Sequence, residues 1–253
     1  MSGKSKLSDE EYEELLDPMA KELSAMARWV SETKQRMLSV YNYMASGVLL
    51  TGIVALGFAN SSLINLIVNP ATGQATALFW IALFAPLGLV FALGFGINRM
   101  SASTAQALFW VYAALVGVQF SSLFLVYTGV SIAQTFFAVA ASFLGLSLYG
   151  YTTKRDLSGM RSFLVMGVVG IFVALLINMF LRSPTFDLAI SAIGVLIFAG
   201  LVAYDTQKIK SLYFVVAGHG EAMAKTAIIG ALNLYIDFIN MFLFLLRFMG
   251  DRR

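Results

Sequence analysis

The sequence predicts an all-α polytopic membrane protein with seven transmembrane helices. Hydrophobic residues make up 59% of the chain and charged residues 12%, whereas soluble domains average about 45–50% and about 25%. Seven apolar segments are long enough to cross the hydrocarbon core of a bilayer, which takes roughly 20 residues. The last segment carries a stripe of polar side chains, which favours a place inside a helix bundle rather than against lipid.

The seven segments are separated by short polar loops. Glycine and other small residues recur within them, which allows helices to approach closely, and Pro86 lies within the second. The expected spans are residues 37–59, 77–97, 105–126, 132–151, 163–181, 188–206 and 228–248.

A polar segment, residues 1–36, precedes the first span. Asp17 and Pro18 form a typical helix start, with the acid at the N-cap and proline at the first helical position. Apolar side chains follow at helical spacing: Met19, Leu23, Met26 and Val30. The segment is therefore expected to be cytoplasmic and helical, either lying along the membrane surface or leading as a solvated helix into the first span.

Basic residues set the expected orientation. Of the 17 Lys and Arg residues, 13 fall in segments on the same side as the N-terminus. Because Lys and Arg are enriched on the cytoplasmic side, the N-terminus is predicted to be cytoplasmic. The C-terminus lies on the opposite side if the last segment crosses fully, and on the cytoplasmic side if that segment is re-entrant.

Several classes of site are excluded by composition. The chain has no Cys and a single His, His219, which excludes disulfides, thiolate metal sites and multi-His metal sites. A His-based catalytic set is not expected, and the protein is not expected to be an enzyme. No motif for a nucleotide, a haem or a metal cluster is present, so neither a cofactor nor a nucleic-acid partner is expected. The first 17 residues are polar and acidic, unlike a cleaved signal peptide.

The last apolar segment carries its polar groups on one helical face. Asn233, Asp237, Asn240, Phe244 and Arg247 follow the spacing of a single face. A carboxylate at the middle of a membrane span costs about 2.5–3.5 kcal/mol on insertion scales, so Asp237 should face protein or water. We therefore expect this helix to be the central one.

A second carboxylate is expected beside Asp237. Asp205 lies near the inner end of the sixth span, and the turn between these spans is expected at Gly218-His219-Gly220. If the sixth helix continues below the bilayer, both carboxylates lie at the same depth. Arg99 ends the second span on the same side, so its guanidinium is expected to converge on the pair.

Two neighbouring carboxylates in a low dielectric share a proton, which makes the pair a proton-sensitive latch. When deprotonated, the pair offers the oxygen ligands that Ca²⁺ prefers, and Asn233, Asn240 and Tyr204 are candidates to add more. The alternative is a buried ion-pair network that only fixes helix packing.

Three motifs resemble the Bax inhibitor one family, in its bacterial branch. They are residues 150–158, residues 203–209 and residues 234–240, the last followed by Leu245-Leu246-Arg247. The resemblance extends from about residue 35 to the end of the chain. It implies two three-helix layers wrapped around a central C-terminal helix. It also implies a place in a bacterial plasma (inner) membrane.

The resemblance also implies a function, a pH-sensitive Ca²⁺ leak governed by an aspartyl pair that matches Asp205 and Asp237. A basic residue at the end of the second span, matched by Arg99, is similar to one that contacts this pair. Some members also have an acid within the second span, whereas residues 86–92 of this chain contain none.

Two other functions remain open from the sequence. The protein could bind and modulate a membrane-bound protease or a stress-response partner, with residues 1–36 as the contact surface. An intramembrane aspartyl protease would also place Tyr204-Asp205 on one span and an acid on the next. However, the Gly-x-Gly-Asp motif of such proteases is absent around Asp237.

Overall fold

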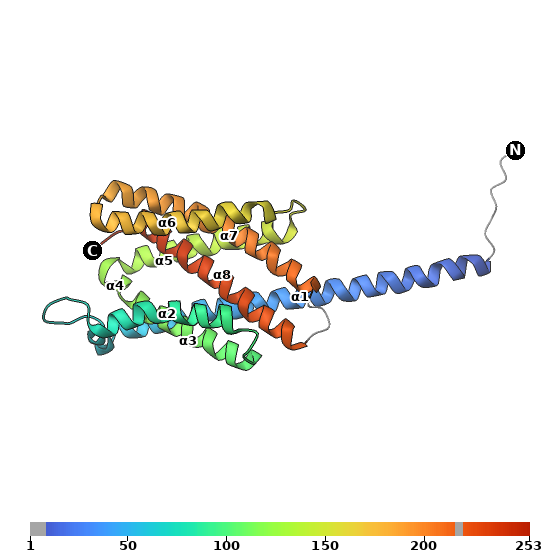
Figure 1. The fold of residues 1–253 in the computed structure, drawn as a ribbon, viewed down its shortest axis with the longest axis horizontal. Coiled ribbons are helices and arrows are strands. Elements are labelled where there is room, and N and C mark those ends of the chain that lie inside the picture. The colour runs from blue at the N-terminus through green and yellow to red at the C-terminus, as the bar shows by residue number, and fades with distance from the viewer. Residues whose placement is uncertain (1–8, 216–219) are drawn as a thin grey trace.

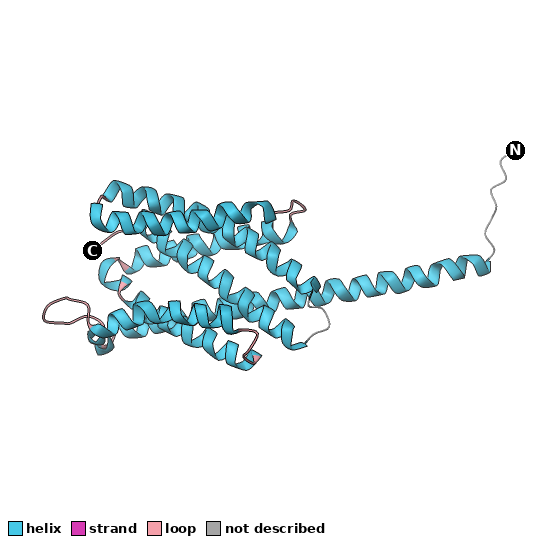
Figure 2. Cartoon of the chain, viewed as in Figure 1, coloured by secondary structure: helices cyan, strands magenta, loops and turns pink. Residues whose placement is uncertain are grey.

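The computed structural model describes residues 9–215 and 220–253, and it is helical almost throughout (Figures 1 and 2). Two residues of the expected turn, Gly218 and His219, lie outside this described part. In chain order the elements are α1 (Asp9–Ala59), η1 (Ser62–Leu66), α2 (Ala77–Gly96), α3 (Ala102–Ser121), α4 (Leu123–Val126), α5 (Gly129–Thr152), η2 (Ser158–Met160), α6 (Arg161–Leu181), α7 (Pro184–Val215) and α8 (Gly220–Met249).

Seven helical stretches of the described chain are long and apolar enough to cross a membrane, as predicted. They are Lys34–Ala59, Ala77–Gly96, Ala102–Val126, Gly129–Thr152, Ser158–Leu181, Pro184–Tyr213 and Gly220–Met249. Each overlaps one expected span, and the sixth continues past residue 206 as the depth argument required. Side chains cap several starts, since Thr76, Ser101 and Thr128 each accept a hydrogen bond from a backbone N–H three residues on.

The helices form two layers with α8 between them. One layer contains α1, α2 and α3, the other contains α5, α6 and α7, and α8 crosses obliquely between them (Figure 1). In α8, 67% of the most apolar window is buried, against 11–39% in the other six spans. The prediction of a central C-terminal helix is therefore confirmed.

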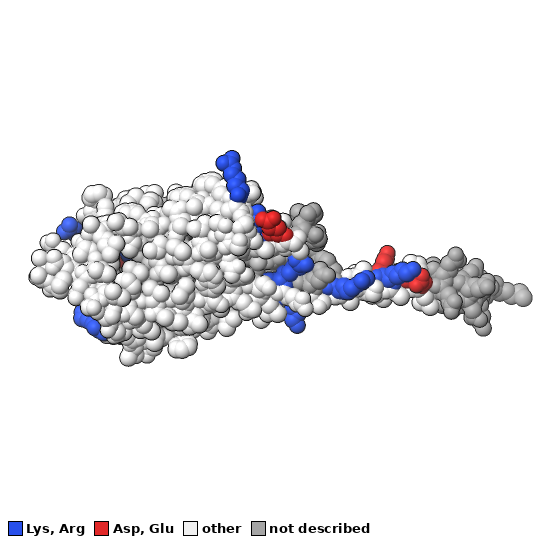
Figure 3. Space-filling view, turned by 90° about the horizontal axis from the view of Figure 1, so that it is seen from below, with Lys and Arg blue, Asp and Glu red and all other residues white. Residues whose placement is uncertain are grey.

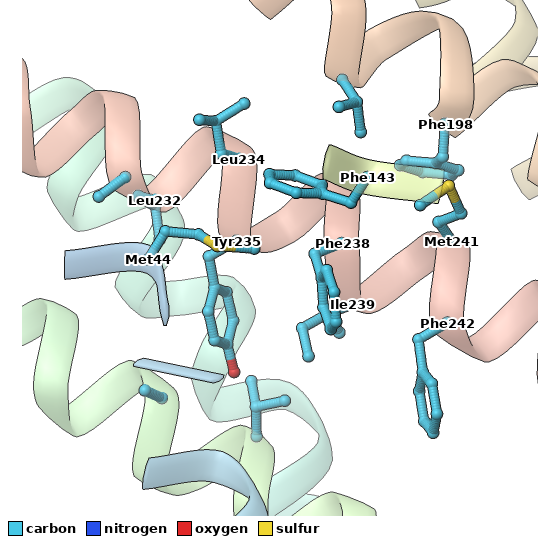
Figure 4. Close-up of a cluster of buried hydrophobic side chains, with 14 of the residues drawn as sticks. Met44, Phe143, Phe198, Leu232, Leu234, Tyr235, Phe238, Ile239, Met241 and Phe242 are labelled. Carbon is cyan, nitrogen blue, oxygen red and sulfur yellow. The ribbon is translucent and has the colours of Figure 1, made fainter. Parts of the chain in front are cut away.

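Aromatic and aliphatic side chains of α8 fill the space between the layers. Tyr235 and Phe238 lie one turn apart on α8, and both extend into the core (Figure 4). Tyr235 packs edge-on against Phe109 and Tyr112 of α3, with ring centroids 6.0 and 5.5 Å apart, while Phe238 packs against Phe143 of α5 at 5.7 Å. Each layer is thus attached to the central helix by direct ring contacts.

Charged side chains occupy the ends of the bundle. On the face shown in Figure 3 they gather at its two ends and along the projecting part of α1, which leaves a broad uncharged belt. Large apolar side chains are exposed on this bundle, including Phe95, Phe180 and Phe137. Such exposure is expected where lipid rather than water is the solvent.

The N-terminal helix differs from its expected start. It begins at Asp9 and continues through Pro18 without a break to Ala59, so the predicted start at Asp17 is wrong. Residues 9–16 are rich in Glu and Leu, which are strong helix formers. At 1.5 Å per residue the 51-residue helix is about 76 Å long, and its first part projects beyond the bundle (Figure 1).

The C-terminus lies at the end of the bundle opposite the projecting helix (Figure 1). Helix α8 has 30 residues and no break, so it is about 45 Å long and crosses the bundle fully. Its tail joins the loop that precedes α5, because Thr128 N–H donates to the Asp251 carbonyl and Arg253 N–H donates to the Val126 carbonyl. The re-entrant alternative is therefore excluded.

Candidate functional site

The candidate site lies between α7 and α8, which run antiparallel and pack closely. Two glycines set their register: Gly194 of α7 lies against the ring of Phe244, and Gly230 of α8 lies against Ile209. Asp205 and Asp237 fall between these two contacts, on the faces that meet. Local packing therefore brings together two acids that are far apart in the chain.

The carboxyl groups of Asp205 and Asp237 are close enough to interact with each other across the α7–α8 interface. A hydrogen bond between two carboxyl groups requires one of them to carry a proton. Asp205 is 9% exposed and Asp237 is 4% exposed. Asp237 Oδ2 is buried and has no hydrogen-bond partner among the described residues, which leaves an acceptor free for a proton, a water molecule or a cation.

Asp205 is the member of the pair closer to solvent. Lys208 Nζ lies 3.9 Å from Asp205 Oδ1, one turn along the same helix, and 5.9 Å from the centre of the Tyr204 ring. Arg161, at the start of α6, also acts electrostatically on Asp205 and Tyr204. Asp205 therefore lies on the solvent side of the pair, near two basic side chains, and Asp237 is more deeply buried.

The loop between α5 and α6 is attached to α7 close to Asp205. Gln207 accepts a hydrogen bond from Leu157 N–H at 2.8 Å and donates one to the Arg155 carbonyl at 2.9 Å. Asp156 accepts two hydrogen bonds from Ser158, one from its N–H and one from its hydroxyl. These bonds hold the pKa of Asp156 below its ordinary value. The connection between α5 and α6 is therefore ordered next to Asp205.

Arg99 does not join the pair. It is exposed just beyond the end of α2, and the charged groups that act on Asp205 are Lys208, Asp237 and Arg161. The physical reason is the position of α2, which packs on α3 at the outside of its layer. The expectation that Arg99 converges on the carboxylates is therefore wrong, and Lys208 and Arg161 take its place.

The remaining candidates differ in their relation to the pair. Tyr204 and Asn233 are half-buried within one turn of Asp205 and Asp237, respectively. Asn240 donates to the Ile236 carbonyl at 2.8 Å and lines a hollow near the C-terminus with Asp187 and Arg247. Asn240 thus faces away from the pair. Within residues 9–215 and 220–253, no three acidic or histidine side chains form a metal-binding group.

The sequence matches a known family over most of its length. Residues 33–253 match the family model described as "Inhibitor of apoptosis-promoting Bax1". The chain belongs to the Bax inhibitor-1 family.

Bacterial relatives support this membership. An uncharacterized protein of Rickettsia prowazekii (strain Madrid E) is 49% identical over 220 residues, which cover 87% of this chain and 91% of the relative. The inner membrane protein YbhL of Escherichia coli (strain K12) is 45% identical over 219 residues, covering 86% and 92%. An uncharacterized protein of Caulobacter vibrioides is 46% identical over 223 residues, covering 86% and 88%. The resemblance seen in the three motifs is thus confirmed for this Bax inhibitor-1 family member.

Proposed function

We propose that this membrane protein is a pH-sensitive Ca²⁺ leak channel, gated by the carboxyl pair of Asp205 and Asp237. The observation that carries the proposal is the placement of two buried, interacting carboxyl groups between α7 and α8. One of them, Asp237, has an oxygen without a hydrogen-bond partner among the described residues. The relative named YbhL is an inner membrane protein, and we extend that location to this chain, with the N-terminus in the cytoplasm.

A shared proton keeps the pair closed. When one carboxyl group carries the proton, the hydrogen bond between the two groups holds α7 against α8. When that proton leaves, two carboxylates in a low dielectric repel each other, and the contact between the helices loosens. Because Asp205 is nearer solvent, the proton leaves through Asp205 and past Lys208.

Ca²⁺ is the ion that best fits the deprotonated pair. Two carboxylates supply at most four oxygen ligands, whereas Ca²⁺ takes six to eight. Water must complete the coordination, so the pair binds the ion briefly and releases it. This is the behaviour required of a transported ion. In this proposal the pair exchanges a proton for an ion, and the only covalent bond that breaks and re-forms is the O–H bond of the protonated carboxyl group.

Ca²⁺ flux into proteoliposomes, measured across pH 6–8, tests the proposal. We expect the wild-type flux to rise with pH, and we expect Asp205→Asn and Asp237→Asn to flatten that dependence. Asp17→Asn is the matched control, because Asp17 is an exposed acid far from the pair. An unchanged pH profile in both folded pair variants, checked by circular dichroism and gel filtration, would exclude the gate.

A second candidate function rests on the projecting part of α1. Four large apolar side chains lie on it at the spacing of a helical interaction stripe and are 55–64% exposed: Leu16, Met19, Leu23 and Met26. They follow the same seven-residue period as Met37, Val40 and Met44, which are buried in the bundle. This stripe suits a helix of another protein, and we propose a membrane-bound protease or a stress-response protein as that partner.

Replacing these four side chains with Gln separates the two functions. Co-purification with membrane-bound proteases from native membranes should be lost, while Ca²⁺ flux should remain. A control that replaces Ala20 and Ala25 with Gln adds the same polar side chains beside the stripe. If both variants retain the partner equally, the stripe is not the contact surface.

A further inference from the structure

A second group of charged side chains lies at the end of the bundle where the C-terminus is. Arg182 follows α6, Arg247 is in the last turn of α8, and Arg252 is in the tail. Asp187, in the first turn of α7, lies 3.7 Å from Arg247 and 3.9 Å from Arg252. This group is separate from the Asp205 and Asp237 pair and plays no part in the proposed gate.

Two hollows meet at this group. One, of about 380 Å³, is lined by Arg182 and by Asn178 and Ser183 at the α6–α7 connection. The other, of about 440 Å³, has mainly apolar walls from α4, α6 and α8. Both are also lined by Asp187, Arg247 and Arg252. The two hollows therefore share one charged wall, and the second is also lined by leucine side chains of α4, α6 and α8.

The tail fixes Arg252 in place. In addition to its two backbone hydrogen bonds with the loop before α5, the tail donates from Asp251 N–H to the Ser131 hydroxyl at 2.9 Å. The guanidinium of Arg252 lies 5.9 Å from the centre of the Tyr127 ring. Arg252 is thus presented by an ordered backbone and an aromatic contact.

Positive charge at this wall exceeds negative charge. Three guanidinium groups line the hollows, and Asp187 is the one acid that lines them within the described chain. At 3.7 and 3.9 Å the two ion pairs are longer than hydrogen bonds. The described residues supply no hydrogen-bond acceptor to these three side chains, each of which carries five N–H donors. Their donors therefore remain available to an anion.

Phosphate matches this donor set. Arginine binds phosphate through two parallel N–H donors, and the contact is stronger where water is partly excluded. The start of α7 at Pro184 adds the positive end of a helix dipole to the first hollow. The second hollow, with Leu123, Leu175 and Leu243 in its walls, offers apolar contacts to a hydrocarbon chain.

We propose that the two hollows bind an anionic phospholipid from the leaflet on the C-terminal side. The phosphate group lies among Arg182, Arg247 and Arg252, and the start of an acyl chain lies against the leucine side chains of the second hollow. This proposal does not depend on Ca²⁺ transport.

Ligand-dependent thermal shifts of the full chain in a neutral detergent test the proposal. The probes are dioctanoyl phosphatidylglycerol, dioctanoylglycerol without phosphate, and inorganic phosphate. We expect phosphatidylglycerol to raise the melting temperature at concentrations where the other two do not. Arg182→Gln and Arg252→Gln should each lower the affinity for phosphatidylglycerol by about tenfold or more, since a charged hydrogen bond contributes at least about 1.5 kcal/mol.

Two further variants sharpen the result. Asp187→Asn removes the acid that competes with a phosphate group for Arg247 and Arg252. This variant should therefore bind phosphatidylglycerol several-fold more tightly than the wild type. Arg155→Gln, at the opposite end of the bundle, is the matched control and should bind like the wild type. An equal response to inorganic phosphate would show a soluble-anion site instead. The proposed site would be overturned if dioctanoylglycerol raised the melting temperature as much as phosphatidylglycerol does. It would also be overturned if the arginine variants bound phosphatidylglycerol as tightly as the wild type.

Discussion

The hydroxyl groups of Thr51 on α1 and Tyr235 on α8 lie 2.6 Å apart in the buried core. Thr51 Oγ1 is also 2.8 Å from the Ala113 carbonyl of α3. One side chain thus joins three helices, and it joins the projecting N-terminal helix to the same central helix that carries Asp237. Both hydroxyl groups are satisfied by this arrangement, as buried polar groups require.

Tyr235→Phe should lower the melting temperature of the purified protein. The change removes the hydroxyl that pairs with Thr51 and keeps the ring contacts with Phe109 and Tyr112. The expected loss is about 0.6–1.5 kcal/mol, the usual range for a buried hydrogen bond in water or within a membrane. Tyr149→Phe is the control, because Tyr149 is half exposed on α5, and its melting temperature should not change.

Gly150→Ala should disrupt the packing of α5 on α7. A Cβ atom at this position would overlap the backbone carbonyl oxygen of Ala203, which cannot move aside as a flexible side chain does. We expect a large fall in folded yield and melting temperature. Gly145→Ala, one to two turns earlier, would meet nothing within 4 Å and should be neutral or slightly stabilising, since Ala favours a helix over Gly. Equal behaviour of the two variants would contradict the close contact of these helices.

Ser158→Ala should raise the pKa of Asp156 toward the ordinary value. The lowered pKa of Asp156 comes first from the N–H and then from the hydroxyl of Ser158, and the variant loses the second. A carboxyl group with a lowered pKa favours the folded loop above its unfolded pKa, and this contribution is lost as pH falls through the folded pKa. A titration by NMR with labelled aspartate, between about pH 2 and 6, measures the shift. No movement of the Asp156 resonance in the variant would exclude the hydroxyl bond.

Lys208→Gln should increase the apparent affinity of the proposed channel for Ca²⁺. A cation that reaches Asp205 must displace the Lys208 ammonium, 3.9 Å away. Because this ion pair is partly exposed, it contributes at most about 1 kcal/mol, so half-maximal flux should need up to about fivefold less Ca²⁺. Lys210→Gln is the control, since Lys210 donates to the Tyr151 carbonyl instead. A similar shift in both variants would indicate a general surface-charge effect.

Single cysteines can establish the orientation, because the chain has none of its own. Lys154→Cys and Gln74→Cys place a thiol in exposed loops at opposite ends of the bundle. With a cytoplasmic N-terminus, a membrane-impermeant maleimide added to spheroplasts should label Gln74→Cys and leave Lys154→Cys unlabelled until the membrane is broken. The reverse pattern would invert the proposed topology.

Much of the fold could be predicted because the bilayer imposes simple rules. The seven spans follow from length and hydrophobicity, and the central position of α8 follows from an acid that lipid does not tolerate. The pairing of Asp205 with Asp237 follows from equal depth on two consecutive antiparallel helices. These arguments need no knowledge of how separate helices pack.

The depth of a residue in the membrane does not show which neighbouring helix its side chain meets. The prediction for Arg99 failed for this reason. Arg99 ends the second span on the expected side, but α2 lies outside α3, so Arg99 does not reach the pair. Lys208 does reach the pair. Its position three residues after Asp205 on the same helix could have predicted this contact. The pairing of Asp187 with Arg247 and Arg252 depends on where the tail folds back, which spacing along the chain does not reveal.

The backbone pairing between the last residues and the loop before α5 has a practical consequence. A reporter or purification tag fused after Arg253 is attached to a tail whose backbone is hydrogen-bonded to residues 126 and 128. A bulky protein fused there would strain the tail, which positions Arg252 and covers one end of the bundle. Labels for imaging or capture are better attached at the projecting N-terminal helix, where the chain extends well clear of the other six spans.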